Sequence, residues 1–239
     1  TIDKAGNISG EVSQDIKLDK VAPDFTISPS TTSTTHEDVI LTVKATDEHS
    51  GVKRIRRPDG TWVTGSSLTY NAVNNGTFTF RVEDNAGNIR DRSITVSNID
   101  KTLSFVAPNV SGLQSITIPE SATVFWTDIT APVIKDWTEG ANEWRLQVSA
   151  TPIVGVTVVL NPIENVTRVK GTGTSPTQAH NGSRKAIDKG ALPLVSAKGS
   201  RGEYHVAFPS EALGVIVDPT TTRPGQFNTT ILWEVVNAP

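Results

Sequence analysis

The sequence predicts an all-β protein with two domains, and three observations support this fold class. Apolar and polar residues alternate in short runs, turns rich in Gly and Asn separate the runs, and one motif recurs at a fixed distance. A chain of 239 residues is long enough for two domains of ordinary size. No stretch of useful length has helical periodicity, and Glu211-Ala212-Leu213 is expected to form at most a turn.

The composition favours a folded, soluble protein and excludes several kinds of site. Hydrophobic residues make up 36% of the chain and charged residues 20%, as in globular domains. The longest apolar stretch, residues 153–160, has the length of a strand, so no membrane span is expected. The sequence contains no cysteine, which excludes disulfides, cysteine-ligated zinc and thiol catalysis.

The charge distribution argues against nucleic acid as a partner. The formal net charge is -3, and neither half of the chain has the basic excess that phosphate neutralisation requires. The one basic concentration comprises Lys53, Arg54, Arg56 and Arg57. We expect it to be a solvated strand end and turn, with a patch for an anionic ligand as the alternative.

An internal repeat is visible in the first half of the chain. Residues 3–8 (DKAGNI) recur as residues 84–89 (DNAGNI), a displacement of 81 residues. Asp19-Lys20 recurs as Asp100-Lys101 at the same displacement. Two separate matches at one offset indicate a repeated structural unit.

The repeat sets the predicted domain boundaries. Residues 1–19 are expected to be the C-terminal hairpin of a truncated preceding repeat, residues 20–102 a repeat domain, and residues 103–239 a second domain. Because residue 1 is Thr rather than Met, we expect the chain to begin within a longer precursor.

The repeat domain has the pattern of an antiparallel β-sandwich. Val39, Leu41 and Val43 alternate with polar or exposed neighbours, and so do Phe80 and Val82. Turn sequences separate the runs: 58–60 (PDG), 74–76 (NNG) and 85–88 (NAGN). Short strands at this spacing in about 80 residues are typical of a sandwich.

Three segments of this domain resemble bacterial immunoglobulin-like surface repeats. They are 45–52 (ATDEHSGV), 58–63 (PDGTWV) and 74–88 (NNGTFTFRVEDNAGN). The resemblance implies an immunoglobulin-like β-sandwich that serves as a stalk segment joined end to end with others.

Five aspartates raise the question of calcium, although we predict no metal and no cofactor. Carboxylates near domain junctions can form oxygen-rich Ca²⁺ sites. The same residues also hydrogen-bond the backbone of their own turns, and no spacing here reproduces a calcium loop. We favour the turn interpretation and keep a calcium site of Asp19, Asp84 and Asp100 as the alternative. The five residues are Asp3, Asp19, Asp47, Asp84 and Asp100.

The second domain also has the pattern of β-strands. Trp144, Leu146 and Val148 would share one face of a strand, and Trp233 and Val235 would share one face of another. Further short runs rich in β-branched residues lie between these two strands. The polar segment from 170 to 193 is expected to be a long surface excursion.

Two motifs of this domain are similar to those of the WxL domain at the C-terminus of Gram-positive surface proteins. The first is Trp144-Arg145-Leu146 and the second is Trp233-Glu234-Val235, which an Ala-Pro ending follows closely. Val235 stands where the family has Leu, so the second motif departs from the pattern. The fold implied is a second β-sandwich or a barrel-like domain.

The resemblance also implies a location, a ligand and partners. It implies a secreted protein on the cell wall or surface of a Gram-positive bacterium, attached non-covalently to peptidoglycan or another wall glycan. It further implies association with other surface proteins of the same system. The residues of the two motifs are then the candidate ligand-binding residues.

The tryptophans allow two interpretations. An exposed indole can pack its flat apolar face against a sugar ring. Large aromatic residues on strands are more often part of the core, which would make Trp144 and Trp233 structural. In that case Trp126 and Trp137 become the candidates for surface contacts.

No catalytic constellation is apparent, and we predict that the protein is not an enzyme. The four histidines are scattered, and no nucleophile-elbow, zinc-protease or P-loop motif occurs. The alternative to wall binding is a protein-interaction or adhesion module that assembles with partner surface proteins.

Overall fold

The computed structural model describes residues 2, 4–8, 10, 18–112, 116–140 and 142–237. It is all-β, with strand over 53% of the chain and no helix among the described residues, which confirms the predicted fold class. No helix in these residues is long and apolar enough to cross a membrane. The chain forms two compact units, residues 1–100 (unit 1) and 101–239 (unit 2).

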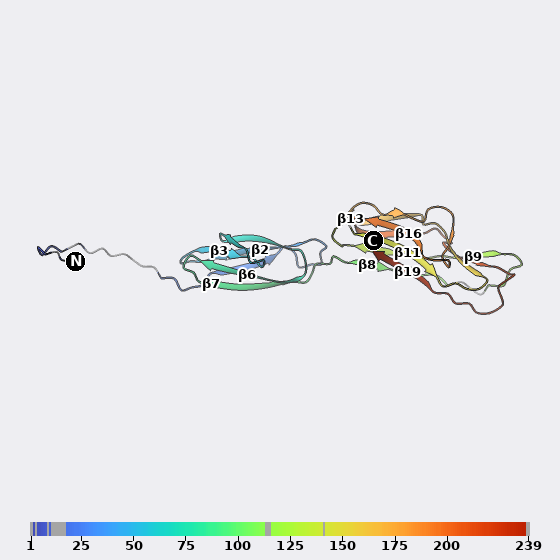
Figure 1. Ribbon diagram of the computed structural model, residues 1–239, viewed down its shortest axis with the longest axis horizontal. Coiled ribbons are helices and arrows are strands. Elements are labelled where there is room, and N and C mark those ends of the chain that lie inside the picture. The colour runs from blue at the N-terminus through green and yellow to red at the C-terminus, as the bar shows by residue number, and fades with distance from the viewer. Residues whose placement is uncertain are drawn as a thin grey trace. The chain divides into compact units, whose positions relative to one another are not determined.

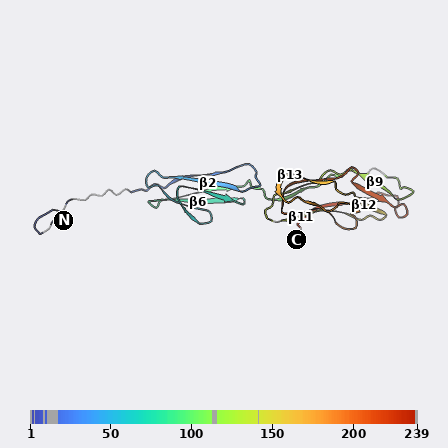
Figure 2. The ribbon, with the colours of Figure 1, turned by 90° about the horizontal axis from the view of Figure 1, so that it is seen from above.

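Unit 1 is a sandwich of two antiparallel sheets, and β2 and β6 belong to its different layers (Figure 1, Figure 2). The first sheet has the order β1-β2-β5. The second has the order β4-β3-β6-β7. The strands are β1 (Asp24–Pro29), β2 (Val39–Thr46), β3 (Val52–Arg56), β4 (Trp62–Thr64), β5 (Ser67–Ala72), β6 (Gly76–Asp84) and β7 (Ile89–Val96).

The core of unit 1 follows the alternation in the sequence. Val39, Leu41 and Val43 on β2 are fully buried, while the residues between them are at least partly exposed. Phe80 and Val82 face them from β6 and are also fully buried. Because side chains on a strand alternate between faces, one buried face per sheet produces this pattern.

Unit 2 packs three four-stranded sheets around one core. Their orders are β13-β17-β10-β8, β14-β16-β11-β19 and β15-β12-β18-β9. The strands are β8 (Leu103–Val106), β9 (Thr123–Thr127), β10 (Val133–Asp136), β11 (Glu143–Ala150), β12 (Val156–Leu160), β13 (Asn165–Gly173), β14 (Thr177–Gln178), β15 (Lys185–Ala186), β16 (Leu192–Lys198), β17 (Ser200–Ala207), β18 (Leu213–Val217) and β19 (Ile231–Asn237).

The polar segment from 170 to 193 is mostly exposed, as predicted for a surface excursion, and it also contains strands. The end of β13, both short strands β14 and β15, and the start of β16 lie within it. Glycines make this possible, since a Cβ at Gly171 would lie 2.0 Å from the carbonyl oxygen of Arg201. The low hydrophobicity of the segment therefore reflects close backbone packing as well as exposure.

Candidate functional site

The two tryptophan motifs lie on neighbouring antiparallel strands. In the pairing of β11 with β19, Leu146 is opposite Val235 and Val148 is opposite Trp233. Trp144 is opposite Asn237 at the end of β19. Segments far apart in the sequence thus form one continuous patch of sheet, and the substituted Val235 packs beside the Leu of the first motif.

Trp144 is a core residue. Only 1% of it is exposed, and its ring centroid lies 5.9 Å from that of Tyr204, a fully buried residue on β17. Its indole Nε1 donates a hydrogen bond of 2.8 Å to Oδ2 of Asp136, which is itself fully buried. An indole with both faces covered and its N–H occupied has no surface to offer a sugar, so its role is structural.

Trp233 is only half-buried, because β19 is an edge strand with one neighbour. It packs edge-to-face against Phe208, with 5.9 Å between the ring centroids. The middle residues of the two motifs point away from the core and are partly exposed, with Glu234 accepting a 3.1 Å hydrogen bond from Gln147. Neither Arg145 nor Glu234 is therefore fixed in the interior.

A groove of about 480 Å³ lies beside the paired motifs and is lined in part by the edge strands β8 and β19. Both strands end their sheets, so the groove runs between two sheet edges. Each of its lining residues is uncharged. They are Leu103, Ser104, Phe105, Thr138, Asn142, Trp144, Val235 and Asn237.

A buried carboxylate fixes one wall of this groove. Asp136 accepts hydrogen bonds from the backbone N–H and the hydroxyl of Thr138 and from the indole of Trp144. Thr138 and Trp144 both line the groove, so Asp136 positions two of its surfaces. A buried charge is tolerated where hydrogen bonds satisfy it, and these three donors satisfy Asp136.

The chemistry of the groove suits a neutral, polyhydroxylated ligand. Amide groups of Asn142 and Asn237 and the hydroxyls of Ser104 and Thr138 supply donors and acceptors. Leu103 and Phe105 supply apolar area. A small number of polar groups around apolar surface is the usual composition of a small-molecule site.

The two other candidate tryptophans of unit 2, Trp126 and Trp137, lie outside the strands that carry the motifs. Trp126 is on the edge strand β9, where its ring covers Gly214: a Cβ there would lie 2.6 Å from the ring. The guanidinium of Arg184 lies 5.8 Å from the ring centroid of Trp126. Trp137 follows β10, is half-buried, and donates its backbone N–H to Thr102. The structure does not bring these two residues together in one site.

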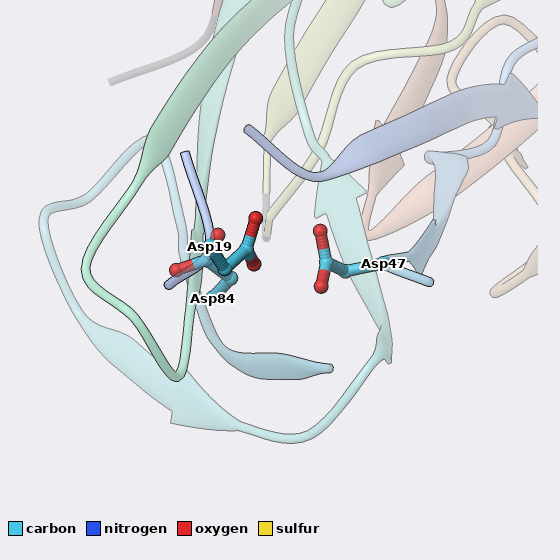
Figure 3. Close-up of side chains that lie close together, drawn as sticks. All are labelled: Asp19, Asp47 and Asp84. Atoms are coloured by element: carbon cyan, nitrogen blue, oxygen red, sulfur yellow. The ribbon is translucent and has the colours of Figure 1, made fainter. Parts of the chain in front are cut away.

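Three of the five aspartates come together at one end of unit 1 (Figure 3). One oxygen from each of Asp19, Asp47 and Asp84 lies within 4.8 Å of the others. The calcium alternative named Asp100 in place of Asp47, but the backbone of Asp100 contacts Thr35 and His36 instead. Asp3 lies outside the described residues. Asp19, Asp47 and Asp84 are the described residues that could hold a metal ion, and their oxygen donors suit Ca²⁺.

Hydrogen bonds within the loops satisfy Asp84 and one oxygen of Asp47, whereas Oδ2 of Asp19 is buried and has no hydrogen-bond partner among the described residues. Asp84 is fully buried, and its two oxygens accept bonds of 2.8 Å from the backbone N–H and side-chain amide of Asn88. One oxygen of Asp47 accepts the N–H groups of Ser50 and Gly51, both at 2.8 Å. Hydrogen bonds, first from the side chain of Ser50, lower the pKa of Asp19. For Asp84 this is the turn-bracing chemistry predicted for D-x-A-G-N.

Comparisons with known proteins bear on unit 1 more than on unit 2. A family model described as a domain of unknown function (DUF7743) matches residues 17–115. The chain matches none of the curated proteins with which it was compared. A solved structure described as a carbohydrate-binding module from the β-sandwich superfamily is 13% identical, covering 90% of this chain and 97% of that one, with a TM-score of 0.29. This TM-score is too low to support a functional conclusion.

Proposed function

We propose that the protein is a non-catalytic cell-surface anchor. Unit 1 serves as a stalk repeat, and unit 2 binds the Gram-positive cell wall non-covalently through a wall glycan such as peptidoglycan. The observation that carries the proposal is the uncharged groove between β8 and β19, beside the paired motifs.

The groove supports a glycan better than a charged ligand. Sugar rings present hydroxyls at their edges and apolar C–H groups on their faces. The lining matches both, because Asn142 and Asn237 offer amides while Phe105 offers an aromatic face. A charged ligand would lose hydration here without gaining an ion pair.

The motif residues support binding indirectly in this proposal. Trp144 forms part of the groove wall and is held by Asp136, while Val235 lines the groove from β19. The motifs therefore shape the site, and the surrounding amides and Phe105 make the contacts.

Sedimentation with cell-wall sacculi tests the proposal. We expect the full chain to pellet with Gram-positive sacculi, and the double variant Asn142→Ala/Asn237→Ala to remain in the supernatant with an unchanged melting temperature. Asn228→Ala is the matched control, since Asn228 is exposed and outside the groove. If the unchanged protein stays in the supernatant across species and salt concentrations, direct wall binding is wrong. If the double variant pellets normally, the groove is not the binding site.

One observation favours a second candidate, a protein-interaction or adhesion module. β8 and β19 are both edge strands, and an edge presents backbone N–H and C=O groups to which a partner's strand can pair. A surface protein that co-purifies with the chain, in the absence of sacculus binding, would favour this candidate. Proline substitution at the edge residue Ser104 should then abolish the association.

A further inference from the structure

The basic cluster of unit 1 keeps most of its positive charge. Lys53 and Arg54 share one carboxylate, that of the buried Glu83, at 2.7 Å each, and the guanidinium of Arg54 lies 4.2 Å from the ring centroid of Trp62. No ion pair is found for Arg56 or Arg57 among the described residues. The four cations of the sequence therefore divide into two that share one anion and two without an ion pair.

A further arginine, Arg81, lies opposite Arg56 on the neighbouring strand. Arg56 of β3 and Arg81 of β6 are partners in the register of the sheet, so their side chains share its outer face. Arg81 forms two hydrogen bonds, of 2.7 and 2.8 Å, with Asp91 of β7. This ion pair lowers the pKa of Asp91, and the charge of Arg56 adds to the shift. Like charges opposite one another destabilise a sheet unless an anion offsets them. The nearby anion, Asp91, is already hydrogen-bonded to Arg81, so Arg56 has no ion-pair partner of its own.

These side chains line a small hollow. Its volume is about 160 Å³, and its lining consists of Arg56, Arg57, Pro58, Thr79, Arg81 and Asp91. Three arginines and one aspartate give the lining a formal charge of +2 (+3 − 1). At about 30 Å³ per water molecule, the hollow has room for roughly five waters, which suits one small group rather than a long ligand.

The donors of the two unpaired arginines are underused. The Nε of Arg57 is shielded from solvent and has no hydrogen-bond partner among the described residues. The Nε of Arg56 donates only to the carbonyl of Gly60, at 3.2 Å. Asp59 lies close enough for the charge of Arg57 to lower its pKa, but that pKa responds first to hydrogen bonds from Thr61. Guanidinium groups without an ion pair are suited to phosphate, because their N–H donors can bind two of its oxygens at once.

We propose that this hollow is a binding site for a single phosphate-type oxyanion, held between the guanidinium groups of Arg56 and Arg57. The group can belong to a phosphodiester polymer of the bacterial surface or to free phosphate, since both present the same oxygens. The site lies in unit 1 and is independent of the groove in unit 2. Its failure would therefore leave the proposed glycan binding unaffected.

Calorimetric titration of inorganic phosphate into the full chain at low ionic strength tests the site. We expect saturable binding that Arg56→Gln and Arg57→Gln each weaken about tenfold, because each removes charge-assisted hydrogen bonds. Arg57→Lys keeps the charge but removes the planar guanidinium. Its affinity for phosphate should lie between those of Arg57→Gln and the unchanged protein. Asp91→Asn should strengthen binding by removing the one negative charge of the hollow.

Lys44→Gln is the matched control for loss of a positive charge, because Lys44 is exposed on the other sheet of unit 1. The proposal is overturned if phosphate does not bind saturably, or if Lys44→Gln weakens binding as much as Arg57→Gln. Titration with a short poly(glycerol phosphate) distinguishes the two sources. Binding that depends on the same arginines assigns the site to a polymer phosphodiester, and binding of inorganic phosphate alone assigns it to the free anion.

Discussion

Trp144 and Trp233 occupy the same place in two copies of one motif, yet the fold gives them different environments. Trp144 is on β11, which has β16 on one side and β19 on the other, and only 1% of it is exposed. Trp233 is on the edge strand β19 and remains half-buried. The indole of Trp144 donates a hydrogen bond to Asp136. No hydrogen-bond partner is found among the described residues for the indole of Trp233.

In the structure the two motifs mark a pairing of neighbouring strands, and their tryptophans are covered to different degrees. Alternation places each tryptophan on the inner face, and the position of the strand in the sheet then decides how completely it is covered. The recognition surface is better sought where the two strands meet the groove, at Val235 and the neighbouring Asn237.

The sharpest test of this contrast is Trp144→Ala, for which we expect the largest effect. Removing a fully buried Trp should destabilise unit 2 by about 3–5 kcal/mol, because it leaves a cavity and removes a hydrogen bond from the buried Asp136. Calorimetric unfolding of the full chain should show the transition of unit 2 shifting while that of unit 1 stays in place. Trp144→Phe is the control that retains much of the ring packing. A loss below about 1 kcal/mol would contradict burial of this side chain.

Trp233→Ala should destabilise unit 2 by less, about 1–2 kcal/mol. Folding buries less apolar area of Trp233 than of Trp144, and the contact with Phe208 is the main packing that the substitution removes. Sacculus binding should be retained in this variant at temperatures where unit 2 is folded. Unchanged melting together with lost binding would instead identify Trp233 as a recognition residue. Equal destabilisation by the two alanine variants would remove the distinction between central and edge strand.

The sequence alone predicts much of the strand structure, because alternation is a local signal. The buried residues Val39, Leu41 and Val43 were predicted as one face of a strand, and they form it. The shared faces of the two motif strands were likewise predicted from spacing. β11 buries its face, whereas Trp233 and Val235 on β19 pack against the core and are only partly buried.

The sites are harder to predict, because they join segments that lie far apart in the sequence. Nothing local connects Phe105 on β8 with Asn237 on β19, which share a groove only after two sheets have packed. The aspartates show the same limit. The repeat identified Asp19 and Asp84, but the loop that completes their cluster supplies Asp47, a position the repeat does not mark.

Asp136→Asn tests the hydrogen bond that distinguishes Trp144 from Trp233. The one amide oxygen cannot replace both carboxylate oxygens, so either the indole N–H or the donors of Thr138 face the amide NH2, and the remaining bonds lose their charge assistance. We therefore expect a loss of about 1–2 kcal/mol. The measurement is again the unfolding transition of unit 2. Asp128→Asn is the matched control, because the Asp128 side chain is exposed and accepts a backbone N–H, that of Glu211, rather than a buried indole. A loss no greater than in this control would mean that the Asp136 charge does not strengthen the contact.

Val235→Leu is expected to have the smallest effect on stability, a change below about 1 kcal/mol in either direction. Val235 is partly exposed and borders an open groove that can accept one more methylene. Its effect on binding is the more informative result. The substitution gives the second motif the same aliphatic residue as Leu146 of the first, and it narrows the groove there. If a glycan enters the groove, affinity for sacculi should change while melting does not. The matched control is Val236→Leu, on the other face of the same strand. An equal change in both variants would show that the groove has no special role, and the wall contact would then have to be sought elsewhere on unit 2.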